Sequence, residues 1–123
     1  MIEGAVGSDL EAGFALTLRG PSGLIREVDA IVDTGFSGYL TIPPGLASAL
    51  ALPQQGIGES LLADGSITHF PYFAGEVMWD DRYLAIEIDA AETTPLVGMR
   101  LLHGYRVCAD VHDGGRLTIE RLP

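Results

Sequence analysis

Short strand-like stretches separated by turn residues run through nearly the whole chain, and this spacing is the feature that most restricts its fold. Apolar and polar residues alternate over 14–20, as in a strand with one buried face, and 26–35 is predicted to be the strand that returns beside it. Only residues 43–52 and those after Gly98 have the composition of a short helix. We therefore predict an all-β fold with seven or eight short strands and one or two short helices, arranged as a sandwich or a partly closed barrel.

Glycine, aspartate and serine residues mark the turns of three hairpins in the second half of the chain. These residue types favour tight turns because they tolerate a left-handed backbone or hydrogen-bond to it. The predicted turns are at Ala63, Asp64, Gly65 and Ser66, at Asp80 and Asp81, and at Asp113, Gly114 and Gly115. We expect Asp80 and Asp81 to lie in solvent.

The size and charge of the chain narrow the possible classes of protein. Its 123 residues, 47% of them hydrophobic, suffice for a single domain (1–123) with its own core. A formal net charge of −10 argues against nucleic-acid binding, which needs clustered Lys and Arg. Residues 1–13 are acidic and lack the parts of a signal peptide, and no apolar run is long enough to span a membrane. We expect no nucleic acid or membrane as partner, and a cytoplasmic location.

Cysteine and histidine residues offer little chemistry. The single cysteine, Cys108, excludes an internal disulfide bond. It lies in a strand-like stretch at 104–111, so we predict a buried thiol. His69, His103 and His112 do not have the spacing of metal ligands, and there is no Cys–His cluster. We therefore predict no metal and no other cofactor.

The stretch with the most chemical content is Val-Asp-Ala-Ile-Val-Asp-Thr-Gly-Phe-Ser-Gly at 28–38. An apolar run leads directly into Asp33, whose charge is costly beside a β-rich core unless something satisfies or uses it. Gly35 and Gly38 let the backbone approach closely or turn sharply, and Thr34 adds a hydroxyl that can lock a loop. A carboxylate at such a turn can act as a base on a water molecule. The alternative is a plain turn in which Asp33 bonds to its own backbone.

Amide hydrolysis needs an acid as well as a base, and a single carboxylate does not supply both. Two carboxylates about 3 Å apart share a proton and provide both roles. The chain has no second Asp-Thr-Gly, so the partner of Asp33 would be Asp33 of another copy. The chain also has a weak internal echo, a similarity between residues 30–35 and 94–99. In both segments apolar residues lead to a glycine after a hairpin, which fits a domain made of two similar halves.

The segment Ile31-Val32-Asp33-Thr34-Gly35-Phe36-Ser37 resembles the active-site loop of aspartic proteases, in particular their single-domain, retropepsin-like branch. Further elements follow in the family's order from about residue 14 to the C-terminus. They are a hairpin where the family has its flap, an apolar-apolar-Gly element before a short helix, and a last strand at 115–122 of the kind used in dimerisation. The resemblance implies the retropepsin-like acid-protease fold, a homodimer, and hydrolysis of peptide or protein substrates.

The resemblance also implies roles for individual residues. Asp33 matches the catalytic aspartate, Thr34 the threonine that locks two loops across the dimer axis, and Gly35 a glycine whose backbone contacts substrate. The remaining matched residues are Phe36 and Ser37 in the active-site loop, Ala63, Asp64, Gly65 and Ser66 in the flap, and Leu96, Val97 and Gly98 in the strand behind the catalytic loop. Phe36 departs from the family's usual Ala or Ser, and Met99-Arg100 replaces the Arg or Asp that follows the second glycine.

Two other functions are compatible with the same residues. The chain could be a catalytically silent module of this fold that binds peptides or dimerises, with Phe36 filling the cleft. It could also be a small-ligand-binding β-barrel, which predicts a monomer with a roomy apolar interior.

Overall fold

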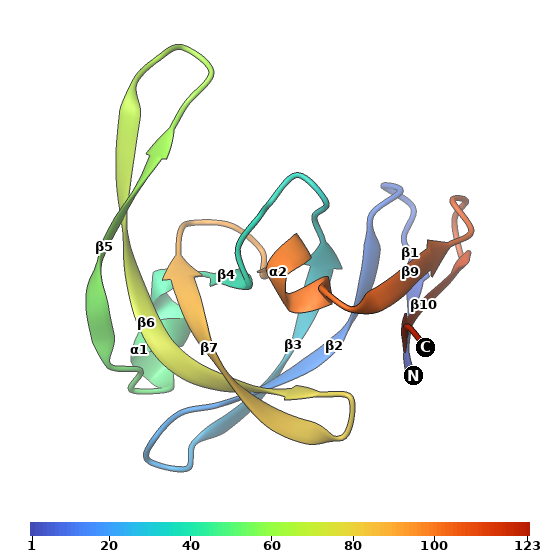
Figure 1. The fold of residues 1–123 in the computed structure, drawn as a ribbon, viewed down its shortest axis with the longest axis horizontal. Helices are drawn as coiled ribbons and strands as arrows, with labels where there is room; N and C mark the ends of the chain where they lie inside the picture. The colour runs from blue at the N-terminus through green and yellow to red at the C-terminus, as the bar shows by residue number, and fades with distance from the viewer.

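The computed structural model describes all 123 residues and contains ten strands and two short helices (Figure 1). The strands are β1 (Ile2–Val6), β2 (Ala12–Arg19), β3 (Ile25–Val32), β4 (Leu40–Ile42), β5 (Gln54–Leu61), β6 (Ile67–Trp79), β7 (Arg82–Ala90), β8 (Leu96–Val97), β9 (Tyr105–Ala109) and β10 (Arg116–Arg121). The helices are α1 (Pro44–Ala49) and α2 (Met99–Leu102). The all-β prediction and both helices are confirmed. Neither helix is long and apolar enough to cross a membrane.

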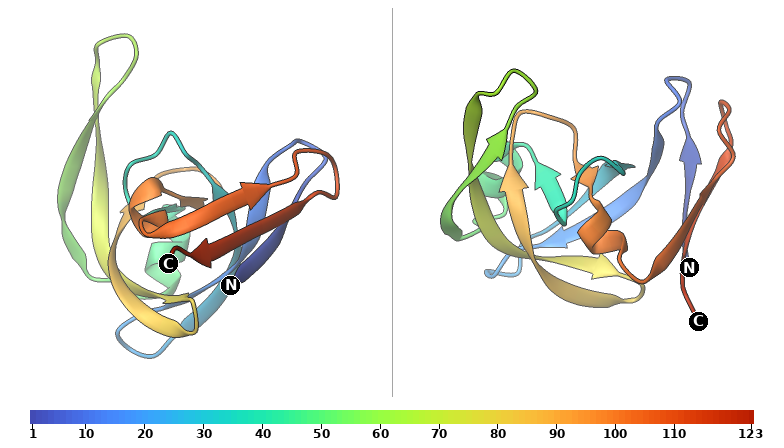
Figure 2. Two further views of the ribbon diagram at one scale, coloured as in Figure 1. Left: turned by 45° about the vertical axis from the view of Figure 1, so that its right-hand side comes forward. Right: turned by 45° about the horizontal axis from the view of Figure 1, so that its top comes forward.

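All ten strands belong to one sheet, in the order β5-β6-β7-β4-β8-β3-β2-β1-β10-β9. An additional antiparallel pairing between β2 and β6 joins Leu18 to Val77 and Arg19 to Glu76. This pairing brings together the two ends of a run of six neighbouring strands, β6-β7-β4-β8-β3-β2. The run therefore bends into a partial ring (Figure 2). The strands therefore form a partly ring-like arrangement rather than a two-sheet sandwich.

Alternating side chains fill the inside of this ring. On β2, Phe14, Leu16 and Leu18 are buried, whereas Ala15 between them is exposed. Eighteen buried residues from the strands and both helices form one hydrophobic cluster. Burial of this apolar surface is the main force that holds the fold together. A filled interior of this kind does not match a small-ligand barrel with a roomy apolar cavity.

The predicted hairpin turns are confirmed, and their backbone geometry explains why the sequence revealed them. The turn between β6 and β7 has only two residues, Asp80 and Asp81, with positive φ angles of 53° and 71°. Aspartate accepts this left-handed backbone better than most residues. A two-residue turn with this backbone also matches the twist of the flanking strands. Gly65, with φ 86°, takes the same role in the turn between β5 and β6.

Two sequence predictions about the chain ends are wrong. The structure has ten strands rather than seven or eight, and β1 is one that the sequence analysis left out. It pairs with β10 from Ile2↔Ile119 to Ala5↔Arg116, so its partner is more than a hundred residues away in sequence. Cys108 is exposed rather than buried, because β9 is an edge strand whose central residues face solvent.

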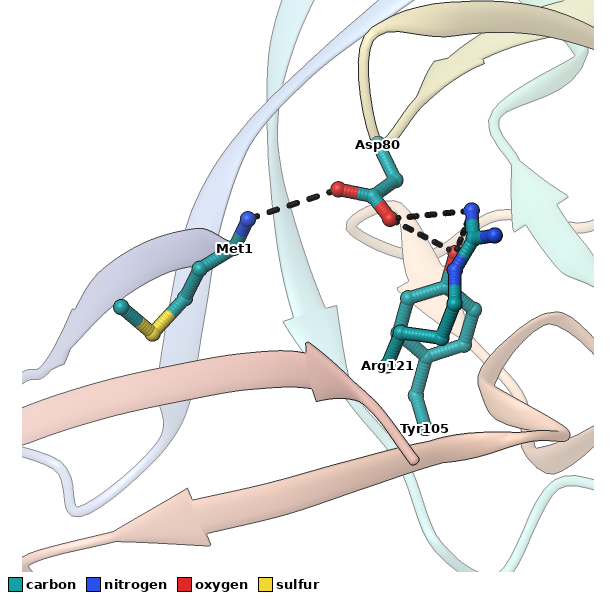
Figure 3. Close-up of polar contacts among 4 residues, drawn as sticks. All are labelled: Met1, Asp80, Tyr105 and Arg121. Atoms are coloured by element: carbon teal, nitrogen blue, oxygen red, sulfur yellow. Dashed lines mark hydrogen bonds and ion pairs between the residues drawn. The ribbon is translucent and has the colours of Figure 1, made fainter. Parts of the chain in front are cut away.

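Asp80 is not a solvated turn residue as predicted, although its neighbour Asp81 is exposed. One Asp80 carboxylate oxygen accepts hydrogen bonds from the Tyr105 hydroxyl at 3.0 Å and from Arg121 at 3.2 Å (Figure 3). The other faces the amino group of Met1 at 3.4 Å. These contacts, the Tyr105 hydroxyl first, lower the pKa of Asp80. The carboxylate thus links the β6–β7 turn to β1, β9 and β10.

Candidate active site

Asp33 lies directly after β3, at the point where β3 runs beside β8. The two strands are parallel, with Ile31 opposite Leu96 and Val32 opposite Val97. The Asp33 amide extends this ladder by donating to the Val97 carbonyl at 2.9 Å. Parallel strands present their carboxyl ends at the same edge, so the two segments of the internal echo meet there. A strand from each half of the chain is therefore part of this central pair.

A tight turn follows Asp33 and holds its carboxylate in place. The Gly35 amide donates to Asp33 Oδ1 at 3.0 Å, and the Phe36 amide donates to the Asp33 carbonyl at 3.2 Å. This is the local hydrogen bond that a plain Asp-initiated turn would make. Oδ2 has no partner within the chain, and Thr34 and Gly35 are exposed beside it. The turn leaves one carboxylate oxygen free to act on something outside the chain.

The Leu96-Val97-Gly98 element clamps the rest of the active-site loop from behind. The amides of Gly98, Met99 and Arg100 donate to the carbonyls of Tyr39, Phe36 and Gly38, at 3.0, 2.8 and 3.1 Å respectively. A Cβ atom at Gly98 would lie 2.2 Å from the Gly38 carbonyl oxygen, so only glycine fits this close approach. The close approach expected at Gly38 is therefore present. Tyr39 was not predicted, because its only signal in the sequence was its position in the same loop.

A groove of about 570 Å³ opens beside the active-site loop. Gly35, Phe36, Ser37 and Gly38 form one wall, and residues of β5 and β6 such as Glu59 and His69 form another. The end of β7 completes it with Asp89 and the residues that follow. The groove therefore lies between the loop and the hairpin that was predicted to be a flap.

The predicted flap tip does not itself line this groove. The β5–β6 hairpin projects away from the body of the molecule, and its turn lies at the far end of the projection (Figure 1). At that turn, Asp64 Oδ1 accepts hydrogen bonds from the amide and the hydroxyl of Ser66. These bonds, the hydroxyl first, lower the pKa of Asp64. The strands of the hairpin thus approach the loop, whereas Ala63 to Ser66 do not.

Asp89 is a groove residue that the sequence analysis missed. It is partly buried, and burial, together with the nearby Glu87 carboxylate, raises its pKa to about 6. On β7, Ile86, Ile88 and Ala90 point into the core, so Asp89 falls on the polar side of the alternation. A polar residue there looks like an ordinary surface residue in the sequence. The Phe36–Gly38 loop approaches Asp89 from a distant part of the chain, and a Cβ atom at Gly38 would lie 3.6 Å from Asp89 Oδ2.

The raised pKa of Asp89 predicts a pH-dependent stability. The folded state holds the Asp89 proton up to about pH 6, whereas the ordinary aspartate value is 3.8. The free energy of unfolding should therefore fall as the pH rises from about 4 through about 6. Asp89→Asn cannot ionise, so we expect it to be roughly 1 kcal/mol more stable than the wild type at about pH 8, after allowance for solvent screening, and equally stable near pH 3.5.

Urea denaturation of both proteins across this pH range checks the prediction. Asp81→Asn, which removes an exposed carboxylate from the same acidic protein, controls for the general effect of losing one negative charge. Parallel stability curves for wild type and Asp89→Asn would contradict the assignment.

A second concave surface, of about 600 Å³, lies on the other side of Asp33. It is mainly apolar, with Leu10, Ile31, Leu96 and Val111 among its residues, and Asp33 and Thr34 lie at its border. Leu10 and Val111 are 58% and 69% exposed, so this surface leaves large apolar side chains uncovered. Exposed apolar side chains that lie together in a concave surface are a candidate contact for a partner.

The strands at the two chain ends are not open edges, in contrast to the last strand free for dimerisation that the resemblance implies. β1 lies between β2 and β10, and β10 lies between β1 and β9. The open edges of the sheet are β5 and β9. The strand at 115–122 therefore already has both neighbours within its own chain, and β9 is the edge strand next to the apolar surface.

The chain matches no known protein-family model, and a search of curated proteins finds no significant match.

The histidines are placed apart from one another. His69 Nε2 lies 3.2 Å from a Glu59 carboxylate oxygen at the groove, and His112 contacts the carbonyl of Asp113. No group of three or more His, Cys, Asp or Glu side chains is arranged to hold a metal ion. The ionisable side chains at the site are Asp33 and the groove residues Glu59, His69 and Asp89.

Proposed function

We propose that this protein is an aspartic endopeptidase with the retropepsin-like fold, active as a homodimer in the cytoplasm. The observation that carries the proposal is the position of Asp33 at the end of the central β3–β8 pair. One of its oxygens is held by Gly35 and the other is free. A general base that removes a proton from an attacking water molecule needs both a fixed position and a free lone pair.

The mechanism requires the same residue from two chains. The two Asp33 carboxylates would share one proton and hold a water molecule between them. The ionised one takes a proton from the water as the water oxygen attacks the scissile carbonyl. The protonated one donates its proton to the carbonyl oxygen, which gives a neutral tetrahedral intermediate. The substrate would lie extended in the groove and pair with the β5–β6 hairpin as an added strand.

The apolar surface beside Asp33 is the place we assign to the second copy. It borders Asp33 and Thr34, which must meet across the two-fold axis, and it exposes Leu10 and Val111. Isologous pairs about a two-fold axis are the commonest oligomers, and burying these side chains would favour one. This assignment replaces the dimerisation through chain-end strands that the resemblance implies.

Val111→Glu should weaken the dimer and the activity together. It would introduce a charge into each half of an apolar contact, and we expect the dissociation constant to rise by about two orders of magnitude. Sedimentation velocity measures the dimer fraction. In the wild type, peptide cleavage should rise more steeply than linearly with enzyme concentration in the dilute range. Leu24→Glu, at a similarly exposed position in the β2–β3 turn, is the matched control.

A wild-type chain that stays monomeric at high concentration and still cleaves peptides in strict proportion to its amount would refute the dimer.

The second candidate is a silent module that binds peptides or dimerises without cleaving them. The position of Phe36 favours it, because the ring packs over Gly38 and Gly98 and lines the groove. A bulky ring there narrows the space for substrate. Incubation with a diverse peptide library, with and without an inhibitor that mimics the tetrahedral intermediate, separates the two functions. Inhibitor-sensitive cleavage supports the peptidase, and binding without cleavage supports the module.

A further inference from the structure

The groove beside the active-site loop contains a carboxylate without a cationic partner. Asp89 lies opposite Thr41 on β4 and Tyr72 on β6, and its side chain forms no hydrogen bond or ion pair within the chain. The chain has seven arginines and no lysine, and none of the arginines lines the groove. A partly buried carboxylate in this position has lost part of its hydration without gaining an opposite charge.

An aromatic ring lies next to this carboxylate. A Cβ atom built on Gly38 would be 2.6 Å from two carbons of the Phe36 ring and 3.6 Å from Asp89 Oδ2. The ring and the carboxylate therefore border the same small volume. A carboxylate beside an aromatic ring suits a guanidinium or ammonium group, through an ion pair and a cation–π contact.

The groove has a second carboxylate besides Asp89. Glu59 lines the opposite wall, and its carboxylate is 3.2 Å from His69 Nε2, the only basic side chain of the groove. The protein as a whole has a formal net charge of −10. This field would attract positively charged ligands and repel acidic ones.

We propose that this groove is a subsite for an arginine or lysine side chain of an extended peptide, and that Asp89 is its specificity-determining residue. The inference rests on the proposed function, because it takes the ligand to be a peptide. Phe36 then contacts the stem and the charged head of the bound side chain. Phe36, where the family usually has Ala or Ser, would thus help to recognise the ligand.

Peptide binding tests the subsite separately from catalysis. Fluorescence anisotropy would measure the affinity of labelled extended peptides that carry arginine, citrulline or glutamate at one scanned position. Citrulline has the shape of arginine without its charge. At about pH 7.5 we expect the arginine peptide to bind the wild type about tenfold more tightly than the citrulline peptide, as for a charge-assisted hydrogen bond, and the glutamate peptide to bind more weakly still.

The variants locate the effect at Asp89. In Asp89→Asn the preference for arginine over citrulline should fall to about twofold or less, because the isosteric amide keeps the shape and loses the charge. Asp81→Asn, an exposed position outside the groove, should keep the full preference. A cleavage assay with the same peptides is run in parallel.

Each outcome has a distinct meaning. Arginine preference that depends on Asp89, with no cleavage of any peptide, supports the subsite and overturns the peptidase. Cleavage without arginine preference supports the peptidase and overturns the subsite. An arginine preference that survives in Asp89→Asn overturns the role of Asp89, and absence of binding by every peptide overturns the subsite.

Discussion

Asp33→Asn is expected to lower peptide cleavage by about 10³-fold to 10⁴-fold while leaving the fold intact. The amide cannot accept the proton of the attacking water, so the variant loses the base of the mechanism. Its oxygen can still accept the hydrogen bond that Gly35 donates at 3.0 Å in the wild type, so the turn should keep its shape. Steady-state cleavage of a fluorogenic peptide, with circular dichroism and sedimentation on the same samples, measures both effects.

Asp29→Asn is the matched control for this experiment. Asp29 lies on β3, four positions before Asp33, and its side chain is exposed. The substitution removes the same charge from β3 without touching the active-site loop, so activity should remain near that of the wild type. Appreciable cleavage by purified Asp33→Asn would remove Asp33 from the mechanism, and equal losses in both variants would point to an effect of charge alone.

Gly98→Ala is expected to destabilise the protein by about 3 kcal/mol and to abolish activity with it. The added Cβ would lie 2.2 Å from the Gly38 carbonyl oxygen and 2.6 Å from a carbon of the Phe36 ring. The backbone oxygen cannot move without breaking the hydrogen bond that it accepts from the Arg100 amide at 3.1 Å. The clamp between the active-site loop and α2 should therefore open. Urea denaturation and the peptide assay report the two losses.

Gly45→Ala separates this close approach from a general effect of replacing glycine. Gly45 lies in α1, and a Cβ there would have no neighbour within 4 Å. Alanine also favours a helix over glycine by about 1 kcal/mol, so this variant should be as stable as the wild type or slightly more so. If Gly98→Ala proved as stable as Gly45→Ala, the tight packing of the loop against β8 would be wrong.

The hairpins, the helices and the position of the Asp-Thr-Gly turn could be predicted because each depends on residues close together in sequence. Asp80 and Asp81 tolerate the left-handed backbone of a two-residue turn, and Pro44 suits the first turn of α1. The alternation on β2 predicted its buried face. In each case a few neighbouring side chains restrict the backbone, whatever the rest of the chain does.

The predictions that failed depend on distant partners. β1 has a weak strand pattern and becomes a strand because β10 supplies its hydrogen bonds. Cys108 has the pattern of a buried strand residue, but β9 lies at the edge of the sheet. The same long-range pairing encloses β1 and β10, which removes them as open edges for a dimer.

The sequence alone therefore determined the class of the fold, the turns and the catalytic candidate Asp33, because local backbone preferences and side-chain chemistry are properties of short segments. Only the tertiary structure decided what surrounds Asp33. It brought β8 beside β3, set an apolar surface on one side and a groove on the other, and turned Asp89 from an ordinary strand residue into a partly buried carboxylate facing Phe36 and Gly38. These environments arise from contacts between segments far apart in the chain, and burial and electrostatic potential depend on such contacts.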